Sequence, residues 1–150
     1  MKFTPAKLNL FLLLNLPSAW ITGVRVKEVT EEHCVTLVRY RWINQNPFNS
    51  MYFAVQAMAA ELSTGVLVMK EVKATGRDFS MLVAQNRSRF SRKARGRIIF
   101  ICDDVEGIRQ NVKKSSENGL GCTFWVRSVG YNEQQEEVST FEFEWTLRPR

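Results

Sequence analysis

The sequence has few of the residues that hold a metal ion or a disulfide framework. Its 150 residues include one histidine and three cysteines, Cys34, Cys102 and Cys122, which are far apart and form no CxxC pair. Neither a zinc site nor a disulfide framework is therefore predicted, and no metal is expected. Each cysteine lies in an apolar extended segment without a neighbouring base, which is typical of structural thiols rather than nucleophiles. Unpaired cysteines indicate a reducing compartment, so we expect a cytoplasmic protein.

Long apolar runs and internal repeats are missing too. The apolar run near the N-terminus is too short to cross a bilayer and is interrupted by Asn9 and Asn15. Lys2 and Lys7 give this run a superficial likeness to a signal peptide, but its apolar residues recur at helical spacing. These residues are Leu8, Phe11, Leu12 and Leu16. We expect an N-terminal helix that packs on the protein, no membrane span, and a single domain over residues 1–150, since no linker divides the chain.

Acidic residues are fewer than basic ones, 15 against 21, which gives a net charge of +6 and a pI near 9.5. Such an excess favours polyanionic partners. One basic run contains no acid, and its candidates for binding nucleotide phosphates are Arg87, Arg89, Arg92, Lys93 and Arg95. A solvated face is the alternative interpretation of this run. Aromatic residues lie between these cations, but they alternate toward the expected core and no RNA-recognition signature is present, so no nucleic-acid partner is expected.

Apolar periodicity predicts six strands and an enclosed helix. Residues 23–29 and 34–43 form two extended segments, and 79–90, 95–102, 120–131 and 138–147 form four more, with a polar helix at 103–118. Between these groups, about residues 50–70 are apolar on nearly all sides, with Asn49 or Ser50 as the expected helix cap. Only enclosure hides every side of such a helix. We expect an α+β fold: an antiparallel sheet of five to six strands curled around this central helix, plus the N-terminal helix.

The segment NPFNSMYFAVQAMAAELSTG contains the start of this helix and one acid, Glu61, among apolar and small residues. Together with NLPSAWITGVRV, RFSRKARGRIIFIC and the order of elements, it resembles the hotdog-fold acyl-CoA thioesterase superfamily, and particularly a branch of uncharacterised members. In that superfamily His-Gly-Gly typically opens the central helix, and an Asp or Glu follows nine residues after the His. Glu61 matches the acid, whereas Tyr52, Phe53 and Ala54 stand in place of His-Gly-Gly.

The resemblance implies that Glu61 acts as general base or nucleophile on a thioester, while backbone N–H groups near Phe53 and Ala54 polarise the carbonyl oxygen. Burial of a carboxylate raises its pKa toward the range useful for a base. The alternative is a structural carboxylate paired with an arginine across a subunit interface. Thr64 and Asn49 are further candidates that would bond to the reacting water or the thioester, with purely conformational roles as the alternative for both.

The function that the resemblance implies is hydrolysis of an acyl-CoA or related thioester by a homodimer or tetramer with its site between subunits. CoA enters as part of the substrate, so no separate cofactor is expected. The alternative is a non-catalytic hotdog module that binds acyl-CoA, acyl chains or a protein partner, because Tyr52 and Phe53 replace a small, open loop. Hydratase chemistry on this fold needs an active-site histidine, and His33 lies in a polar turn far from the helix start, so that activity is not expected.

Overall fold

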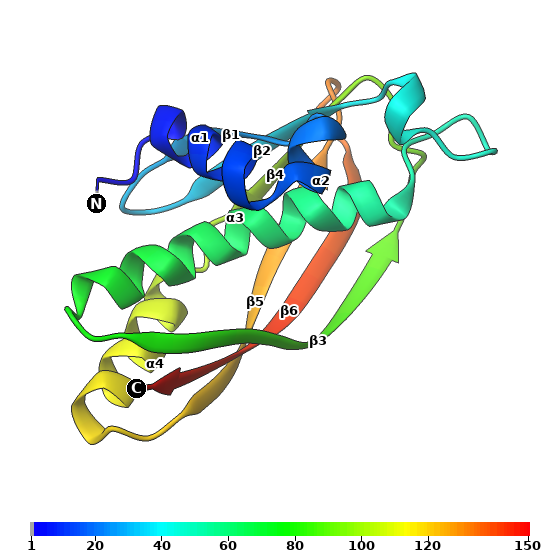
Figure 1. The fold of residues 1–150 in the computed structure, drawn as a ribbon. Helices are drawn as coiled ribbons and strands as arrows, with labels where there is room; N and C mark the ends of the chain where they lie inside the picture. Colours follow the sequence, from blue (N-terminus) through cyan, green and yellow to red (C-terminus); the bar gives the residue numbers. More distant parts are fainter. Residues whose placement is uncertain (1) are drawn as a thin grey trace.

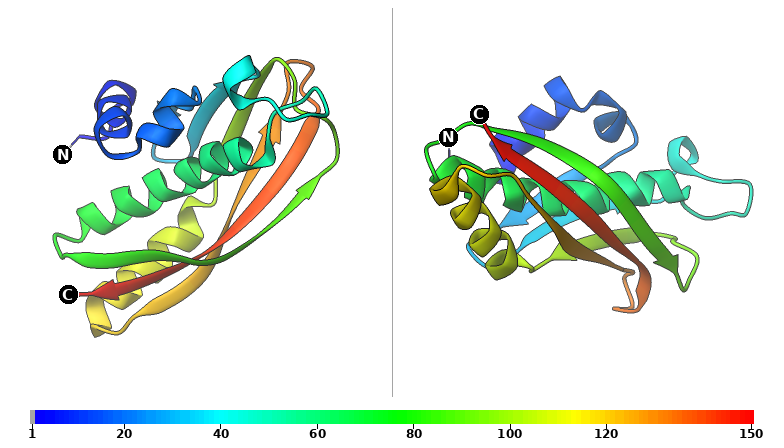
Figure 2. Two further views of the ribbon diagram at one scale, coloured as in Figure 1. Left: turned by 45° about the vertical axis from the view of Figure 1, so that its right-hand side comes forward. Right: turned by 90° about the horizontal axis from the view of Figure 1, so that it is seen from below.

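One antiparallel sheet contains all six strands in a computed structural model that describes residues 2–150. Its strands are β1 (Arg25–Val29), β2 (Cys34–Arg39), β3 (Phe79–Phe90), β4 (Arg97–Cys102), β5 (Cys122–Tyr131) and β6 (Glu137–Pro149). Its helices are α1 (Pro5–Asn15), α2 (Pro17–Ile21), the short 3-10 helix η1 (Trp42–Asn44), α3 (Phe53–Ala74) and α4 (Val105–Asn118). The strand order is β1-β2-β4-β5-β6-β3. The sheet curls around α3, as Figures 1 and 2 show, which confirms the expected α+β hotdog fold.

The enclosure of α3 follows from its residues. More than half of its 22 residues are buried, and they face the sheet on several sides, because few polar side chains interrupt the apolar surface. Hydroxyl and amide groups of α3 that face the sheet are all paired with strand residues. The buried bonds join Thr36 Oγ1 to the carbonyl of Ala59 (2.7 Å), Ser63 Oγ to Ser128 Oγ (2.7 Å) and Ser139 Oγ to Gln56 Oε1 (2.8 Å). These bonds fix the position of α3 along three different strands.

The N-terminal helix packs where the sequence predicts, with Leu8 and Leu12 buried against the core. Asn9, which interrupts the apolar run in the sequence, has a definite role: its side chain accepts from the N–H of Val26 at 2.8 Å and donates to the Val26 carbonyl at 3.0 Å. These two bonds cover part of the open edge of β1. Among residues 2–150, no helix has both the length and the apolar character needed to cross a membrane.

One feature of the sheet could not be read from the order of the segments, and one local expectation was wrong. The strands at 79–90 and 95–102 follow one another in sequence but are not neighbours: β3 pairs with β6 at one edge of the sheet, and β4 lies between β2 and β5. The cap of α3 is Tyr52, without a side-chain hydrogen bond, rather than Asn49 or Ser50. The reason is that Asn46 organises this loop instead, since its side-chain oxygen accepts from the N–H of Ser50 at 3.2 Å.

We predict that Gly130→Ala destabilises the fold. Gly130 lies directly opposite Phe100 in the β4–β5 register, and a methyl group at Gly130 would lie 2.6 Å from Phe100 Cε1. Because Phe100 is fully buried and cannot move aside, we expect a loss of about 1–3 kcal/mol in the free energy of unfolding. Urea denaturation measures it. Gly107→Ala in α4 is the matched control, since its nearest neighbour would be 3.7 Å away; equal stability of the two variants would contradict the argument.

Candidate active site

Glu61 lies on the side of α3 between the N-terminal helices and β3, where two hollows meet. The first, which we call the apolar hollow, has a volume of about 190 Å³ and is lined by Phe11, Asn15, Leu16, Glu61, Leu62, Gly65, Met69, Met81 and Trp145. The second, the α2 hollow, measures about 150 Å³ and is lined by Leu16, Ser18, Ala19, Met58, Glu61 and Leu62. Both hollows share Glu61 with Leu16 and Leu62. The carboxylate is therefore open to small molecules from two directions.

The carboxylate of Glu61 has an unusual electrostatic environment. Burial raises its pKa from the usual 4.5 to about 7, and no hydrogen bond or neighbouring charge within residues 2–150 counteracts this effect. An unpaired carboxylate in an apolar setting is costly unless it takes up a proton. Near neutral pH the group therefore exists in both protonation states, which is the property that a general base or acid needs. Residues 2–150 of the same chain supply no arginine partner for this carboxylate.

Thr64 is buried behind Glu61, where its hydroxyl bonds to other groups of the protein. Its hydroxyl donates to the backbone carbonyl of Glu61 at 2.8 Å and accepts from Trp145 Nε1 at 3.1 Å. The side chain is fully buried. Its one proton is therefore already used, and the expectation that it bonds to the reacting water gives way to the alternative of bonding within its own helix. Its effect on the site is to fix the indole ring of Trp145 against α3.

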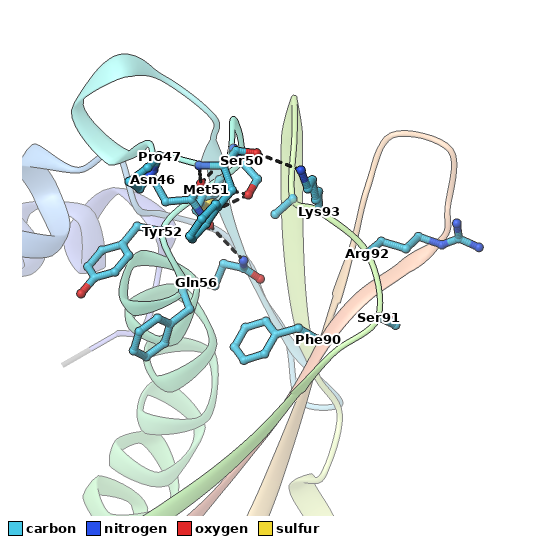
Figure 3. Close-up of a pocket in the computed structure, with 13 residues that line it drawn as sticks. Asn46, Pro47, Ser50, Met51, Tyr52, Gln56, Phe90, Ser91, Arg92 and Lys93 are labelled. Atoms are coloured by element: carbon cyan, nitrogen blue, oxygen red, sulfur yellow. Dashed lines mark hydrogen bonds between the residues drawn. The ribbon is translucent and has the colours of Figure 1, made fainter.

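The start of α3 has free backbone donors, as helix starts do in general. The N–H groups of Phe53 and Ala54 have no acceptor within the described chain, and the cap residue Tyr52 contributes no side-chain bond. A larger hollow of about 640 Å³ opens beside them (Figure 3), lined by the loop before α3, by Gln56, and by residues 90–94. Eight residues at 1.5 Å each place Phe53 about 12 Å from Glu61 along the helix axis. One carbonyl group cannot contact both in the same chain.

Asn49 is not part of the site at Glu61 or of the hollow at the start of α3. It is exposed, has a φ of 59°, and lines neither the hollows beside Glu61 nor the one at the helix start. Its backbone carbonyl accepts from Arg95 Nε at 2.8 Å, which holds the loop against the connection between β3 and β4. Asparagine tolerates the left-handed backbone that this turn requires. The conformational alternative thus accounts for Asn49.

The five candidate cations are divided among three places. Arg87 and Arg89 lie on the outer face of the sheet, in a polar hollow shared with Arg127 and Glu142. Arg87 bonds to Glu142 at 3.1 and 3.2 Å and stacks on Trp125. Arg92 and Lys93 line the large hollow at the helix start, where the Lys93 amine donates to the carbonyl of Phe48 (Figure 3), and Arg95 binds the loop. The run is not one cluster.

Sequence reasoning missed the residues that shape the space around Glu61. Gly65, Met81 and Trp145 come from α3, β3 and β6, and only the fold brings them together. A glycine inside an otherwise apolar helix was the one available signal, because such a glycine usually has a packing or functional reason. The cysteines supply no competing nucleophile: burial raises the pKa of both Cys34 and Cys102, which disfavours the thiolate. No cluster of three metal-binding side chains occurs in residues 2–150.

Comparisons with known proteins agree with this architecture. The model of one protein family, described as a domain of unknown function, DUF4442, matches residues 6–147. A Pseudomonas aeruginosa protein described as a protein of unknown function and probable thioesterase is 25% identical, with a TM-score of 0.82 over 98% of this chain and 97% of its own. A Chlorobaculum tepidum protein of unknown function is 15% identical, with a TM-score of 0.83 over 97% and 94% of the two chains.

A thioesterase from Haemophilus influenzae is 11% identical, with a TM-score of 0.74 over 99% of this chain and 93% of its own. None of the curated proteins matches the chain. The matched structures share the hotdog fold with this chain.

We predict that Glu61 makes stability depend on pH. Its pKa is higher in the folded state, so the folded chain binds more protons than the unfolded chain between pH 4.5 and about 7, and stability falls as the pH rises through this window. Glu61→Gln has no carboxylate at this position, so this contribution to the pH dependence of stability is lost. From the low-pH end of this window to the high-pH end, the free energy of unfolding of the wild type should therefore fall by about 1–3 kcal/mol relative to that of Glu61→Gln.

Urea denaturation on both sides of this window measures the difference. Glu117→Gln, which changes an exposed glutamate on α4, is the control and should follow the wild type at both pH values. If Glu61→Gln also follows the wild type, the carboxylate is not desolvated.

Proposed function

This chain belongs to the DUF4442 family, and we propose that it hydrolyses an acyl thioester, with acyl-CoA as the substrate class, at a site centred on Glu61. The observation that carries the proposal is the unpaired, half-buried Glu61 carboxylate, whose pKa of about 7 suits proton transfer at neutral pH. The thioesterase descriptions of two proteins with the same fold support it.

The chemistry needs one proton acceptor and one oxyanion site. Deprotonated Glu61 accepts a proton from water while the water oxygen bonds to the thioester carbonyl carbon. The carbonyl oxygen gains negative charge, which free backbone N–H groups at the start of α3 stabilise. The carbon–sulfur bond then breaks, and the leaving thiolate takes the proton from Glu61. Direct attack by the carboxylate, with later hydrolysis of the anhydride, is the other route open to the same group.

Two copies of the chain are needed for this constellation. Phe53 and Glu61 are about 12 Å apart along one helix, so the oxyanion donors that serve Glu61 come from a partner subunit. The edge strand β3 supports pairing, because its 12 residues have a strand neighbour, β6, on one side only. Aromatic side chains near this edge are exposed: Phe53 by 54% and Phe90 by 45%. We therefore propose a homodimer, alone or as half of a tetramer, with each site shared.

In this arrangement the substrate's nucleotide phosphates bind beside the start of α3. Arg92 and Lys93 line the large hollow beside the free N–H groups of α3. Cations and helix-start amides both favour phosphate groups. Arg87 and Arg89 lie on the outer sheet face, away from the start of α3, so we assign CoA binding to Lys93 first. Arg92, which lies 3.2 Å from Glu136, is the second candidate. We place this activity in the cytoplasm.

We predict that Glu61→Gln lowers thioester hydrolysis by about a hundredfold or more while the protein stays folded, because the amide keeps the shape and cannot accept the proton. Release of free CoA from acetyl-, hexanoyl- and palmitoyl-CoA measures the rate. In the wild type, kcat/KM should rise with pH and level off above about 7.

A fully active Glu61→Gln would remove the proposed base. If the wild type binds acyl-CoA, shown by a raised melting temperature, and returns it unhydrolysed, the non-catalytic module is the correct function.

A second prediction tests whether the site is shared. Phe53→Pro removes one free N–H, and proline suits this position because it is the first of the helix and the preceding Tyr52 has a ψ of 132°. We expect about a hundredfold loss of kcat or more. Phe53→Ala, which removes the ring and keeps the N–H, is the control and should retain most of the turnover.

Mixing the two inactive variants gives the decisive measurement. Glu61→Gln and Phe53→Pro subunits, refolded together in equal amounts, form mixed dimers with one intact shared site each. Random pairing then restores about a quarter of the wild-type rate. No recovery in a mixture that light scattering shows to be dimeric would place both groups in one subunit's site.

A further inference from the structure

The apolar hollow is kept open next to Glu61 by the absence of a side chain at Gly65. A methyl group there would lie 3.3 Å from Trp145 Cζ2 and 3.5 Å from Glu61 Oε1. The first distance is tighter than ordinary van der Waals contact. Gly65 thus borders both the carboxylate and the indole ring, and a larger residue would take up the space between them.

The walls of this hollow differ in rigidity. The indole ring of Trp145 is 5% exposed and its Nε1 is bonded to Thr64, so it forms a fixed end wall. Met69 and Met81 line the hollow from α3 and β3, and their unbranched side chains adapt to the shape of a ligand. The polar side chains are Glu61 itself and Asn15, whose amide donates to the Phe11 carbonyl at 3.0 Å. A mostly apolar space beside a reactive carboxylate suits a hydrocarbon group.

The volume of the hollow limits that group. An apolar cavity of about 150 Å³ accommodates benzene. The apolar hollow measures about 190 Å³, which is somewhat more than this, and it is partly open. It covers a compact acyl group almost fully, whereas most of a long fatty chain would extend out of it into water.

We propose that the apolar hollow binds the acyl group of the substrate and that Gly65 is a specificity-determining residue, so that the protein prefers compact acyl groups of about the size of a benzene ring. The inference rests on the proposed function and specifies its substrate class. With the acyl group in this hollow and the carbonyl carbon beside Glu61, the sulfur side of the thioester points toward the α2 hollow, which meets the apolar hollow at Glu61.

The test compares acetyl-, butyryl-, hexanoyl-, benzoyl- and palmitoyl-CoA as substrates of the full chain. For the wild type we expect kcat/KM to be highest with butyryl-, hexanoyl- or benzoyl-CoA and at least tenfold lower with palmitoyl-CoA. Gly65→Ala should lower kcat/KM for hexanoyl- and benzoyl-CoA by about tenfold or more relative to its effect on acetyl-CoA, because one methyl group in an apolar site is worth this much. Gly107→Ala, a glycine replaced in another helix, should change nothing.

A second variant covers the case in which Gly65→Ala does not fold. Met81→Ala enlarges the hollow from the partly exposed strand β3, so we expect its preference to shift toward longer acyl groups. Melting temperatures in the presence of hexanoate or benzoate give a readout without turnover: each acid should stabilise the wild type, and Gly65→Ala should reduce that shift.

The outcomes separate the two proposals. If no acyl-CoA is hydrolysed, the proposed function fails. If the wild type hydrolyses thioesters but Gly65→Ala and Met81→Ala change every chain length by the same factor, hydrolysis stands and the acyl group binds elsewhere. A wild type that prefers palmitoyl-CoA also overturns the inference.

Discussion

Enclosure of α3 by a curled sheet is the constraint on which the rest of the structure depends. A helix that is apolar on nearly every side cannot lie on a surface, and the six strands remove most of it from water. Its remaining polar groups pair with the strands, for example the hydroxyls of Ser63 and Ser128 at 2.7 Å. These bonds fix the rotation of α3 about its own axis, and therefore which of its sides lies between the N-terminal helices and β3. Glu61 lies on that side, so the position of the candidate base is a consequence of the packing.

Glu61 is an exception to the rule that buried polar groups of this chain are paired. The same low-polarity surroundings that make the helix stable raise the pKa of the carboxylate to about 7. Structural carboxylates lower their cost by pairing, as Glu71 does with Arg109 at 3.3 Å. Glu61 has no such partner in residues 2–150, although the chain carries 21 basic residues. The fold therefore bears a cost at this position that proton transfer would explain.

Helix geometry links the chemistry to assembly. The free N–H groups at the start of α3 and the carboxylate of Glu61 are too far apart to serve one carbonyl, yet each has a hollow beside it. The homodimer that we propose would resolve this by bringing one chain's helix start to the other chain's carboxylate. The rings of Tyr52 and Phe53, which stand in place of the His-Gly of the superfamily that the sequence resembles, form an edge-to-face contact at 5.2 Å beside this start. The backbone N–H groups stay free in spite of these rings.

The sequence by itself determined the α+β hotdog fold, the enclosed helix and the identity of Glu61 as its exceptional residue, because apolar periodicity and a lone acid in an apolar segment are local properties. It could not show that β3 and β4 are apart in the sheet, since strand pairing depends on contacts between distant segments. Nor could it show that Asn46 rather than Asn49 organises the loop, or that the basic residues separate. Only the tertiary structure decided what surrounds Glu61: Gly65, Met81 and Trp145 come from three elements, and packing alone brings them to one hollow.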